Sequence, residues 1–178
     1  MREDTTITKV YPFNELTDEA KQAVLCELAS VNVDHEWWDG EYEDAKNVLL
    51  KLTEFDLDRN RHCKGEFIES AKDTAQKIIE DHGDMCGTFQ TAKGYLEDRR
   101  KLVEKYSGGI NTQIVAEDNE YEFDNDCEEL DADFLRSILE DYSIMLQKQY
   151  EYLTSEEAIV ETIEANKYEF TEDGKLYS

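Results

Sequence analysis

The chain has very little proline and glycine, with one Pro and eight Gly in 178 residues. Proline breaks helices because it lacks an amide hydrogen and clashes with the preceding turn. Its near absence therefore favours long helices. Ten Tyr, seven Phe and two Trp supply enough apolar material for a core, which excludes a chain that is disordered throughout. A length of 178 residues is typical of one domain.

Three further features are missing. No uninterrupted apolar run approaches the roughly 18 residues that a membrane-spanning helix needs. The first residues lack the basic and then apolar order of a secretion signal. The four cysteines (Cys26, Cys63, Cys86 and Cys127) form no CxxC pair. We therefore expect reduced thiols, no membrane partner and a cytoplasmic location.

Basic residues are scarce, with 19 Lys and Arg against 44 Asp and Glu, which gives a net charge of −25. The excess is uneven. Residues 117–178 carry 20 acids and 4 bases, whereas residues 1–116 carry 24 acids and 15 bases. Such a balance repels nucleic acid and anionic membranes and attracts basic surfaces. It predicts no direct binding of nucleic acid.

Hydrophobic periodicity and turn signals predict a helix-rich α+β fold, a single domain over residues 1–178 with a small antiparallel β-sheet. That sheet would unite both termini with the hairpin at 54–68. The predicted elements are a strand at 5–13, a helix capped by Thr17, a helix at 36–53, a hairpin at 54–68, helices at 70–81, 88–106 and 130–153, a helix reaching Asn166 from a capping box of Thr154 and Glu157, and a closing hairpin around Asp173 and Gly174.

The densest acidic segment is 117–133, with ten carboxylates in seventeen positions. Tyr121 and Phe123 alternate with its acids, which predicts an ordered strand. Alternate acids on a strand would lie about 6.6 Å apart, twice the roughly 3.4 Å between phosphates of one DNA strand. The predicted partner-binding residues are Glu117, Asp118, Glu120, Tyr121, Glu122, Phe123, Asp124, Asp126, Glu128, Glu129, Asp131 and Asp133. The alternative is a solvated loop and helix start whose acids only favour the helix dipole.

A calcium loop is weakly indicated. An EF-hand loop needs Gly at its sixth position and Glu at its twelfth. The series that starts at Asp124 has Glu129 and Leu135 there, and the series that starts at Asp56 fails likewise. A dedicated calcium site does not follow.

A zinc site could be formed by His62, Cys63, His82 and Cys86, although adjacent ligands without a CxxC pair are atypical.

His35 could act as a base oriented by Glu36 or Asp39, but the motif is not HExxH. The alternative is that Asp34 caps a helix and the tryptophans anchor it. We expect no enzyme activity, no cofactor and no metal.

The main basic cluster lies on the predicted helix at 88–106. Its members are Lys93, Arg99, Arg100, Lys101 and Lys105. We expect these cations to pair with the acids of the chain itself. Alternatively, they could hold an acidic neighbour across a homodimer interface.

Residues 10–21 (VYPFNELTDEAK), 32–38 (NVDHEWW) and 42–46 (YEDAK) resemble a group of small uncharacterised phage and prophage proteins. So do EFDLDR at 54–59, CKGEF at 63–67 and, less distinctively, YLTSEEAI at 152–159. Where some members of that group continue with a Gly- and aromatic-rich segment, this chain has Ser70-Ala-Lys-Asp. The resemblance implies a source, with the host cytoplasm as location, and carries over no catalytic residue.

A phage origin adds an analogy of charge and size with DNA-mimicking anti-restriction and anti-CRISPR proteins. The leading hypothesis is an acidic inhibitor whose partner is a basic host protein or nucleoprotein complex. The alternatives are a homo-oligomeric phage accessory protein and a metal-dependent or small-molecule-binding protein.

Overall fold

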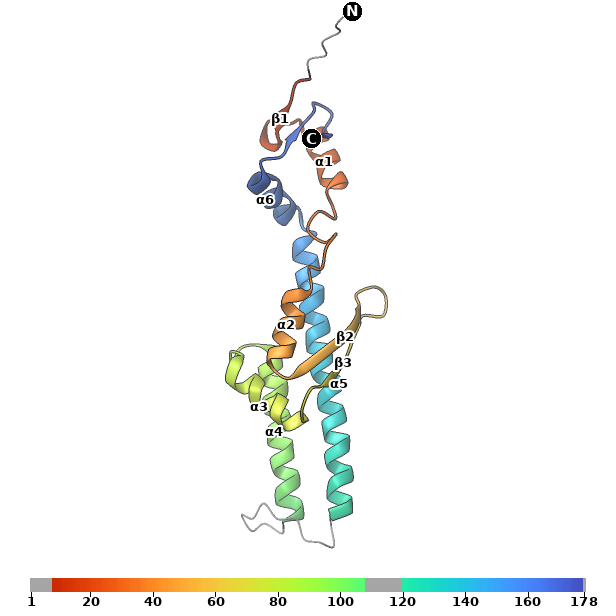
Figure 1. Ribbon diagram of the computed structural model, residues 1–178, viewed down its shortest axis with the longest axis vertical. Coiled ribbons are helices and arrows are strands. Elements are labelled where there is room, and N and C mark those ends of the chain that lie inside the picture. Colours follow the sequence, from red (N-terminus) through yellow and green to blue (C-terminus); the bar gives the residue numbers. More distant parts are fainter. Residues whose placement is uncertain (1–7, 108–119, 178) are drawn as a thin grey trace, which may run out of the picture. The chain divides into compact units, whose positions relative to one another are not determined.

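The computed structural model describes residues 8–107 and 120–177. The fold is α+β and rich in helix, as the sequence predicts (Figure 1). In chain order the elements are β1 (Tyr11–Pro12), the short 3₁₀ helix η1 (Phe13–Glu15), α1 (Asp18–Glu27), α2 (Asp39–Asn47), β2 (Leu50–Asp56), β3 (His62–Phe67), α3 (Ala71–Asp81), α4 (Gly87–Tyr106), α5 (Glu120–Leu153), α6 (Glu156–Asn166), β4 (Glu169–Phe170) and β5 (Leu176–Tyr177). Within the described ranges, no helix is both long and apolar enough to cross a membrane.

The chain forms two compact units. The first comprises residues 1–37 and 148–178, and the second comprises residues 38–147. Helix α5 contributes its first 28 residues to the second unit and its last six to the first. The assignment of residues 1–178 to one domain stays a prediction, because two compact units can belong to one domain.

In the first unit, the two ends of the chain meet in a three-stranded antiparallel sheet with the order β1-β4-β5. Phe170 is buried against residues of α1 and α6, including Val24 and Ile163. The predicted closing hairpin is confirmed. Gly174 has a φ of 84°, and a Cβ there would lie 2.6 Å from the carbonyl oxygen of Ala20.

Side-chain caps fix the starts of three helices. The Thr17 and Ser70 hydroxyls accept hydrogen bonds from backbone amides in the first turns of α1 and α3, and the predicted cap at Thr17 is confirmed. The capping box predicted at Thr154 is wrong by one residue, because Ser155 caps α6. The Thr154 hydroxyl instead donates to the carbonyl of Tyr150.

The helix predicted at 36–53 is wrong in its second half. Helix α2 ends at Asn47, Leu49 turns the chain with a φ of 65°, and β2 begins at Leu50. Leu50 and Leu52 are buried on either side of an exposed Lys51. An apolar cluster such as Leu49, Leu50 and Leu52 fits both the helix and the strand period, and pairing with β3 decides between them.

Strands β2 and β3 form their own two-stranded sheet, so the prediction of one sheet that unites this hairpin with the termini is wrong. The buried residues of β2 belong to the second unit, whereas Phe170 of the terminal sheet belongs to the first. Each sheet therefore covers a different core.

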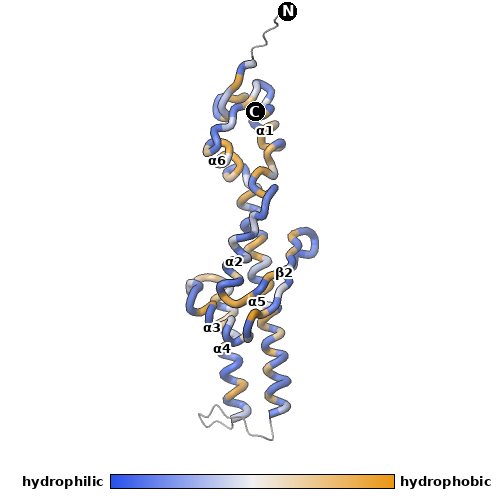
Figure 2. Tube along the Cα trace, in the orientation of Figure 1, coloured by the Kyte–Doolittle hydropathy of each residue, from blue (hydrophilic) through white to orange (hydrophobic). Residues whose placement is uncertain are grey.

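The core of the second unit lies between the hairpin, α4 and α5. Phe134 of α5 stacks on Tyr95 of α4, with ring centroids 4.3 Å apart, and on Phe67 of β3 at 5.7 Å. Ile138, Tyr142 and Leu146 extend this buried face along α5. Hydrophobic residues accordingly recur among hydrophilic ones along α4 and α5 (Figure 2).

Gly65 allows close packing at this core. A Cβ at Gly65 would lie 2.6 Å from the carbonyl oxygen of Lys51 and 3.0 Å from the side chain of Leu139. We expect Gly65→Ala to lower the free energy of unfolding by roughly 1–3 kcal/mol, because a carbonyl of the paired strand cannot move aside. Urea denaturation would measure this.

Gly94→Ala is the matched control, since a Cβ there meets nothing within 4 Å. Gly94 lies inside α4, so alanine should stabilise the protein by about 0.5–1 kcal/mol. Equal effects of the two substitutions would contradict the close approach at Gly65.

Candidate partner-binding surface

The acidic segment is helical, not a strand. Helix α5 begins at Glu120, ten residues before the predicted start at Leu130. Glu117 and Asp118 lie outside the described residues. The rows of alternate acids expected on a strand are therefore absent from residues 120–133. The signal for a helix was present in the spacing of Phe123, Cys127, Leu130 and Phe134, which recur every three or four residues.

The two predicted contact aromatics have different environments. The Phe123 ring lies edge-on to Tyr106 of α4, with centroids 5.7 Å apart, and is half-buried. Tyr121 is 80% exposed. Phe123 therefore helps to hold α5 against α4, whereas Tyr121 is free to contact a partner.

Two of the predicted acids also hold α4 and α5 together. The Tyr106 hydroxyl donates to Asp126 over 2.7 Å, and Lys105 Nζ lies 3.0 Å from the same carboxylate. The Tyr95 hydroxyl donates to Asp131 over 2.6 Å, and Arg99 lies 3.0 Å from it. The Tyr106 and Lys105 hydrogen bonds hold the pKa of Asp126 below its usual value. Both acids belong to the internal packing of the α4–α5 pair.

Tyr95 and Arg99 form the better protected of these two pairings. Tyr95 is 4% exposed, and burial followed by its bond to Asp131 raises the pKa of its hydroxyl. The hydroxyl therefore stays protonated and acts as a donor. Arg99 also donates to the Tyr95 oxygen over 3.2 Å, so the three side chains form a closed network.

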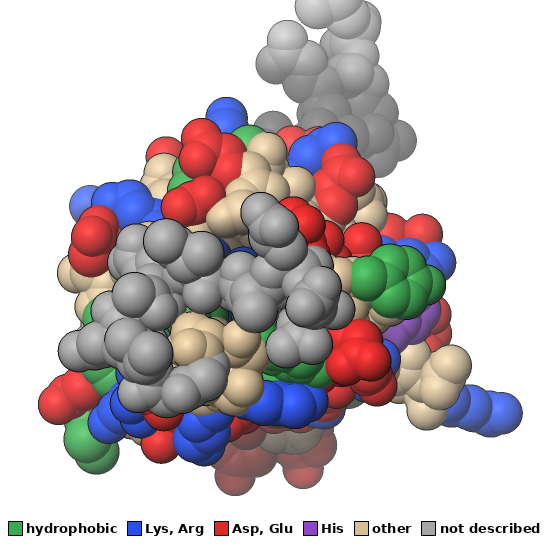
Figure 3. Space-filling model, turned by 90° about the horizontal axis from the view of Figure 1, so that it is seen from below, with side chains coloured by type: hydrophobic (Ala, Val, Ile, Leu, Met, Phe, Trp, Pro, Cys, Tyr) green, Lys and Arg blue, Asp and Glu red, His purple; other side chains and the backbone are tan. Residues whose placement is uncertain are grey.

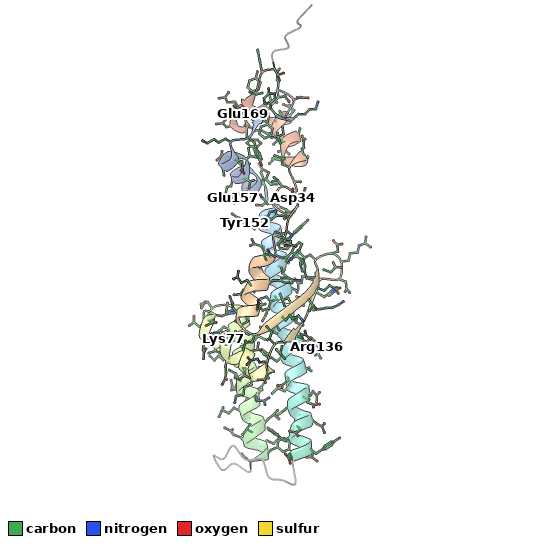
Figure 4. All side chains as sticks on the ribbon, viewed as in Figure 1. Asp34, Lys77, Arg136, Tyr152, Glu157 and Glu169 are labelled. Atoms are coloured by element: carbon green, nitrogen blue, oxygen red, sulfur yellow. The ribbon has the colours of Figure 1, made fainter. Side chains whose placement is uncertain are left out.

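Five acids of the segment remain exposed without a basic partner among the described residues. They are Glu120, Glu122, Asp124, Glu128 and Glu129. Asp133 is exposed but lies 3.0 Å from Arg136, which is labelled on α5 in Figure 4. We call these five acids the free acidic face of α5, which extends over roughly 200° around the helix axis.

The basic cluster of α4 is largely paired within the chain, as the sequence analysis expected. In addition to Arg99 and Lys105, Arg100 pairs with Glu104 at 2.7 Å and Lys101 with Asp98 at 2.9 Å. Viewed from below, Lys and Arg side chains lie next to Asp and Glu side chains (Figure 3). This part of the surface therefore carries both signs of charge.

Two grooves of about 520 Å³ each border α4. One lies between α4 and α5 and is lined by Leu102 and Leu130 with charged residues of both signs. The other is lined by Leu96 and Val103 of α4, and its charged lining residues are all cations, namely Lys72 of α3 with Arg99 and Arg100. In a chain of net charge −25, a groove with only basic charges stands out.

A second cluster of polar side chains lies around His82, the residue that follows α3, and joins residues of α2, α4 and α5. His82 Nδ1 is 2.7 Å from the Thr88 hydroxyl, and His82 Nε2 is 3.5 Å from a carboxylate oxygen of Asp44. The Tyr142 hydroxyl donates to the other oxygen of Asp44 over 2.7 Å. The pKa of Asp44 is lowered, first by the interaction with His82 and also by the hydrogen bond from Tyr142. Partial burial acts in the opposite direction and raises it, but does not outweigh these two contacts.

The geometry of this cluster is that of a structural network. Thr88 is 3% exposed and Tyr142 is fully buried. His82 Nε2 is buried and has only Asp44 nearby as a polar partner among the described residues. Asp44 therefore links α2 to α5 and to the turn before α4, and no hydroxyl of the cluster is accessible to a substrate.

The proposed zinc ligands are not brought together. His62 bonds the carbonyl of Asn60 and lies 3.7 Å from Glu54, whereas His82 and Cys86 both contact Thr88. Burial raises the pKa of the Cys63 thiol to about 11, which opposes the thiolate form that metals bind. Across residues 8–107 and 120–177, no three His, Cys, Asp or Glu side chains are arranged to hold a metal ion.

The other candidate motifs have simple local structures. Asp124, Asp126 and Glu128 lie on a helix rather than in a calcium loop. Asp56 accepts a bond from the Asp58 amide in the turn of the β2–β3 hairpin. His35 is exposed beside Asp34, at 3.4 Å. Asp34 does not cap α2, whose N-cap is Trp38, so the capping prediction is wrong. Trp38 packs edge-on to Phe55 at 5.5 Å.

No family model, curated protein or solved structure matches the chain. The resemblance to small phage and prophage proteins therefore has no support beyond the residues that suggested it. The site has to be interpreted from its own geometry.

Internal and free acids of α5 should respond differently to substitution. Asp131→Ala leaves the buried Tyr95 hydroxyl and Arg99 without their acceptor. We expect it to lower the free energy of unfolding by about 1–3 kcal/mol. Glu129→Ala, two residues earlier on the exposed side, should change it by less than about 0.5 kcal/mol. Chemical denaturation of both variants checks this, and a large loss for Glu129→Ala would contradict the division.

Asp44 should make stability depend on pH in the acid range. Because its pKa is lowered in the folded state, its contribution is complete above the unfolded value of 3.8 and is lost as the pH falls through the folded value. The difference in unfolding free energy between the wild type and Asp44→Asn should therefore shrink as the pH falls below about 4. Urea denaturation across this range measures it.

Glu43→Gln on the exposed side of α2 is the control for the change in net charge. Both variants remove one carboxylate from a strongly acidic chain. Only for Asp44→Asn should the difference in unfolding free energy from the wild type change with pH, because only Asp44 belongs to the network with His82 and Tyr142. A constant difference at all pH values would refute the linkage.

Proposed function

We propose that this protein is a non-enzymatic binding protein that occupies a basic, nucleic-acid-binding surface of another protein. The anti-restriction or anti-CRISPR type of inhibitor, encoded by a phage and acting on a host defence complex, is the form of this function that the charge and size favour. The free acidic face of α5 would be the contact surface, with Tyr121 as an aromatic contact.

The observation that carries the proposal is the composition of one helical segment. Residues 120–133 of α5 hold eight acids and no base. Only Asp126, Asp131 and Asp133 among these acids are paired with a cation in the described structure. A long helix held at one side by α4 fixes the backbone that carries the other five, so little backbone entropy is lost when a partner binds.

Counted along the helix axis, the free acids are about as dense as the phosphates of one nucleic-acid strand, with Glu120, Asp124 and Glu128 on one side and Glu122 and Glu129 on another. The five free acids span ten residues of α5. At 1.5 Å per residue this gives one charge per roughly 3 Å, compared with roughly 3.4 Å between phosphates of one DNA strand. Lys and Arg side chains placed for phosphates can donate the same charge-assisted hydrogen bonds to carboxylates.

A variant with neutral isosteres at all five free acids tests the proposal. Glu120, Glu122, Glu128 and Glu129 become Gln, and Asp124 becomes Asn. Asp126 and Asp131 stay unchanged because they hold α4 against α5. The wild type should retain nucleic-acid-binding proteins from a bacterial lysate and be displaced from them by duplex DNA. The variant should lose this binding by at least about tenfold with its helical circular dichroism unchanged.

The matched control removes five exposed acids from the first unit, with Gln at Glu156, Glu157, Glu161, Glu164 and Glu169. Its net charge is the same, so a binding loss in the α5 variant alone locates the surface. Equal loss in both variants would show a non-specific charge effect. Affinity should also fall steeply with added salt, as for other steered electrostatic contacts. Retention that salt and DNA leave unchanged would reject the mechanism.

A further inference from the structure

The groove on the α3 side of α4 is the strongest feature that the proposed function leaves unused. Leu96 and Val103 supply its apolar lining, and its charged lining residues are Lys72, Arg99 and Arg100, of which Arg99 pairs with Asp131 and Arg100 with Glu104. Its volume of about 520 Å³ is large enough for an aromatic or branched side chain of another protein segment. The groove therefore fits an occupant that is apolar and acidic at once.

The first turns of α5 have this chemistry. Tyr121 is 80% exposed and lies between Glu120 and Glu122. Asp124 is also exposed and has no basic partner among the described residues. An exposed tyrosine flanked by carboxylates is the kind of anchor that fills a groove while its charged neighbours pair at the rim.

The acids of α5 also lie on the correct side of the α4–α5 pair. Asp124 and Asp131 are seven residues apart, about two helical turns, so they point in nearly the same direction. Asp131 binds Arg99, which lines the groove. Glu120, one turn before Asp124, continues this row. One surface thus carries a cationic, apolar stripe on α4 beside an acidic stripe on α5.

Such a surface is self-complementary. A two-fold axis places α4 of one copy opposite α5 of the other, so each cationic stripe meets an acidic stripe. Pairs of helical hairpins commonly associate in this way as four-helix bundles. We propose that two copies of this chain form an isologous dimer through this surface, with Tyr121 of each copy in the groove formed by Leu96, Val103 and Arg100 of the other.

This inference does not depend on the proposed function, because it concerns the protein alone. The two are connected in one respect. A dimer covers Glu120 and Asp124, so a basic partner protein and a second copy compete for the same helix. The monomer would then be the form that binds the partner.

Charge reversal tests the dimer by light scattering coupled to size-exclusion chromatography, and by sedimentation, with the purified full chain and no partner. The wild type should be a dimer whose dissociation constant is raised by Tyr121→Ala. Arg100→Glu alone and Asp124→Lys alone should each give monomers, because each places like charges opposite one another twice. Circular dichroism should show the wild-type helix content for both.

Mixing the two variants decides the geometry. In the heterodimer, the new Glu at 100 faces the new Lys at 124, and the native Arg100 faces the native Asp124. The mixture should therefore regain dimers, and so should the double variant R100E/D124K by itself. Lys101→Glu on α4, which lines the other groove, and Glu122→Lys on α5 make the same charge changes away from this groove and should leave the dimer intact.

A monomeric wild type would overturn the proposal. So would a dimer that survives both reversals, a mixture that stays monomeric, or loss of the dimer in the two control variants. A wild-type monomer that instead binds a synthetic peptide of residues 118–126 at its groove would show that the groove takes an acidic segment but not a second copy.

Discussion

The pairing of α4 with α5 is the interaction on which the rest of the second unit depends. Its centre is the stack of Phe134 between Tyr95 and Phe67, which joins two helices and the β2–β3 hairpin. Tyrosine hydroxyls and basic side chains of α4 then bind Asp126 and Asp131 along α5. Because these bonds pair opposite charges at the edge of an aromatic core, they neutralise acids that would otherwise repel one another beside it.

Ion pairs within the second unit offset part of the repulsion in a chain of net charge −25. Most of its cations are used locally. Lys51 and Lys64 pair with acids across the β2–β3 hairpin, and Arg99 and Lys105 pair with acids of α5. Within residues 120–133, the acids left without a cation lie on the exposed sides of α5, where the packing against α4 does not need them. The free acidic face therefore consists of the acids of this segment that the internal ion pairs and hydrogen bonds do not use.

The same division limits what the surface can do. At about 100° per residue, Glu120, Asp124 and Glu128 project to one side of α5, whereas Glu122 and Glu129 project to another, so the free acids form two groups rather than one row. The side chain of Tyr121, which is 80% exposed, projects between these two groups.

Much of the fold could be predicted from residues close together in the chain. Thr17 and Ser70 mark helix starts, and Asp173 and Gly174 mark a hairpin, because caps and turns depend on side chains a few positions away. The boundary between α2 and β2 could not be predicted in this way. Leu50 and Leu52 fit the hydrophobic period of a helix as well as that of a strand, and only pairing with β3 decides between them. The acidic segment was misassigned for a similar reason. Alternating Tyr121 and Phe123 suggested a strand, whereas Phe123 packs on Tyr106, a residue distant in sequence.

The sequence alone determined that this protein is acidic, rich in helix and most negative in its last third. These properties follow from composition and short-range periodicity. Only the tertiary structure decided which acids are free, because that depends on which carboxylates meet Arg99, Lys105 and the tyrosines of a helix some 20 to 36 positions earlier in the chain. Residue types specify the charge, and the packing of α5 on α4 specifies where that charge can be used.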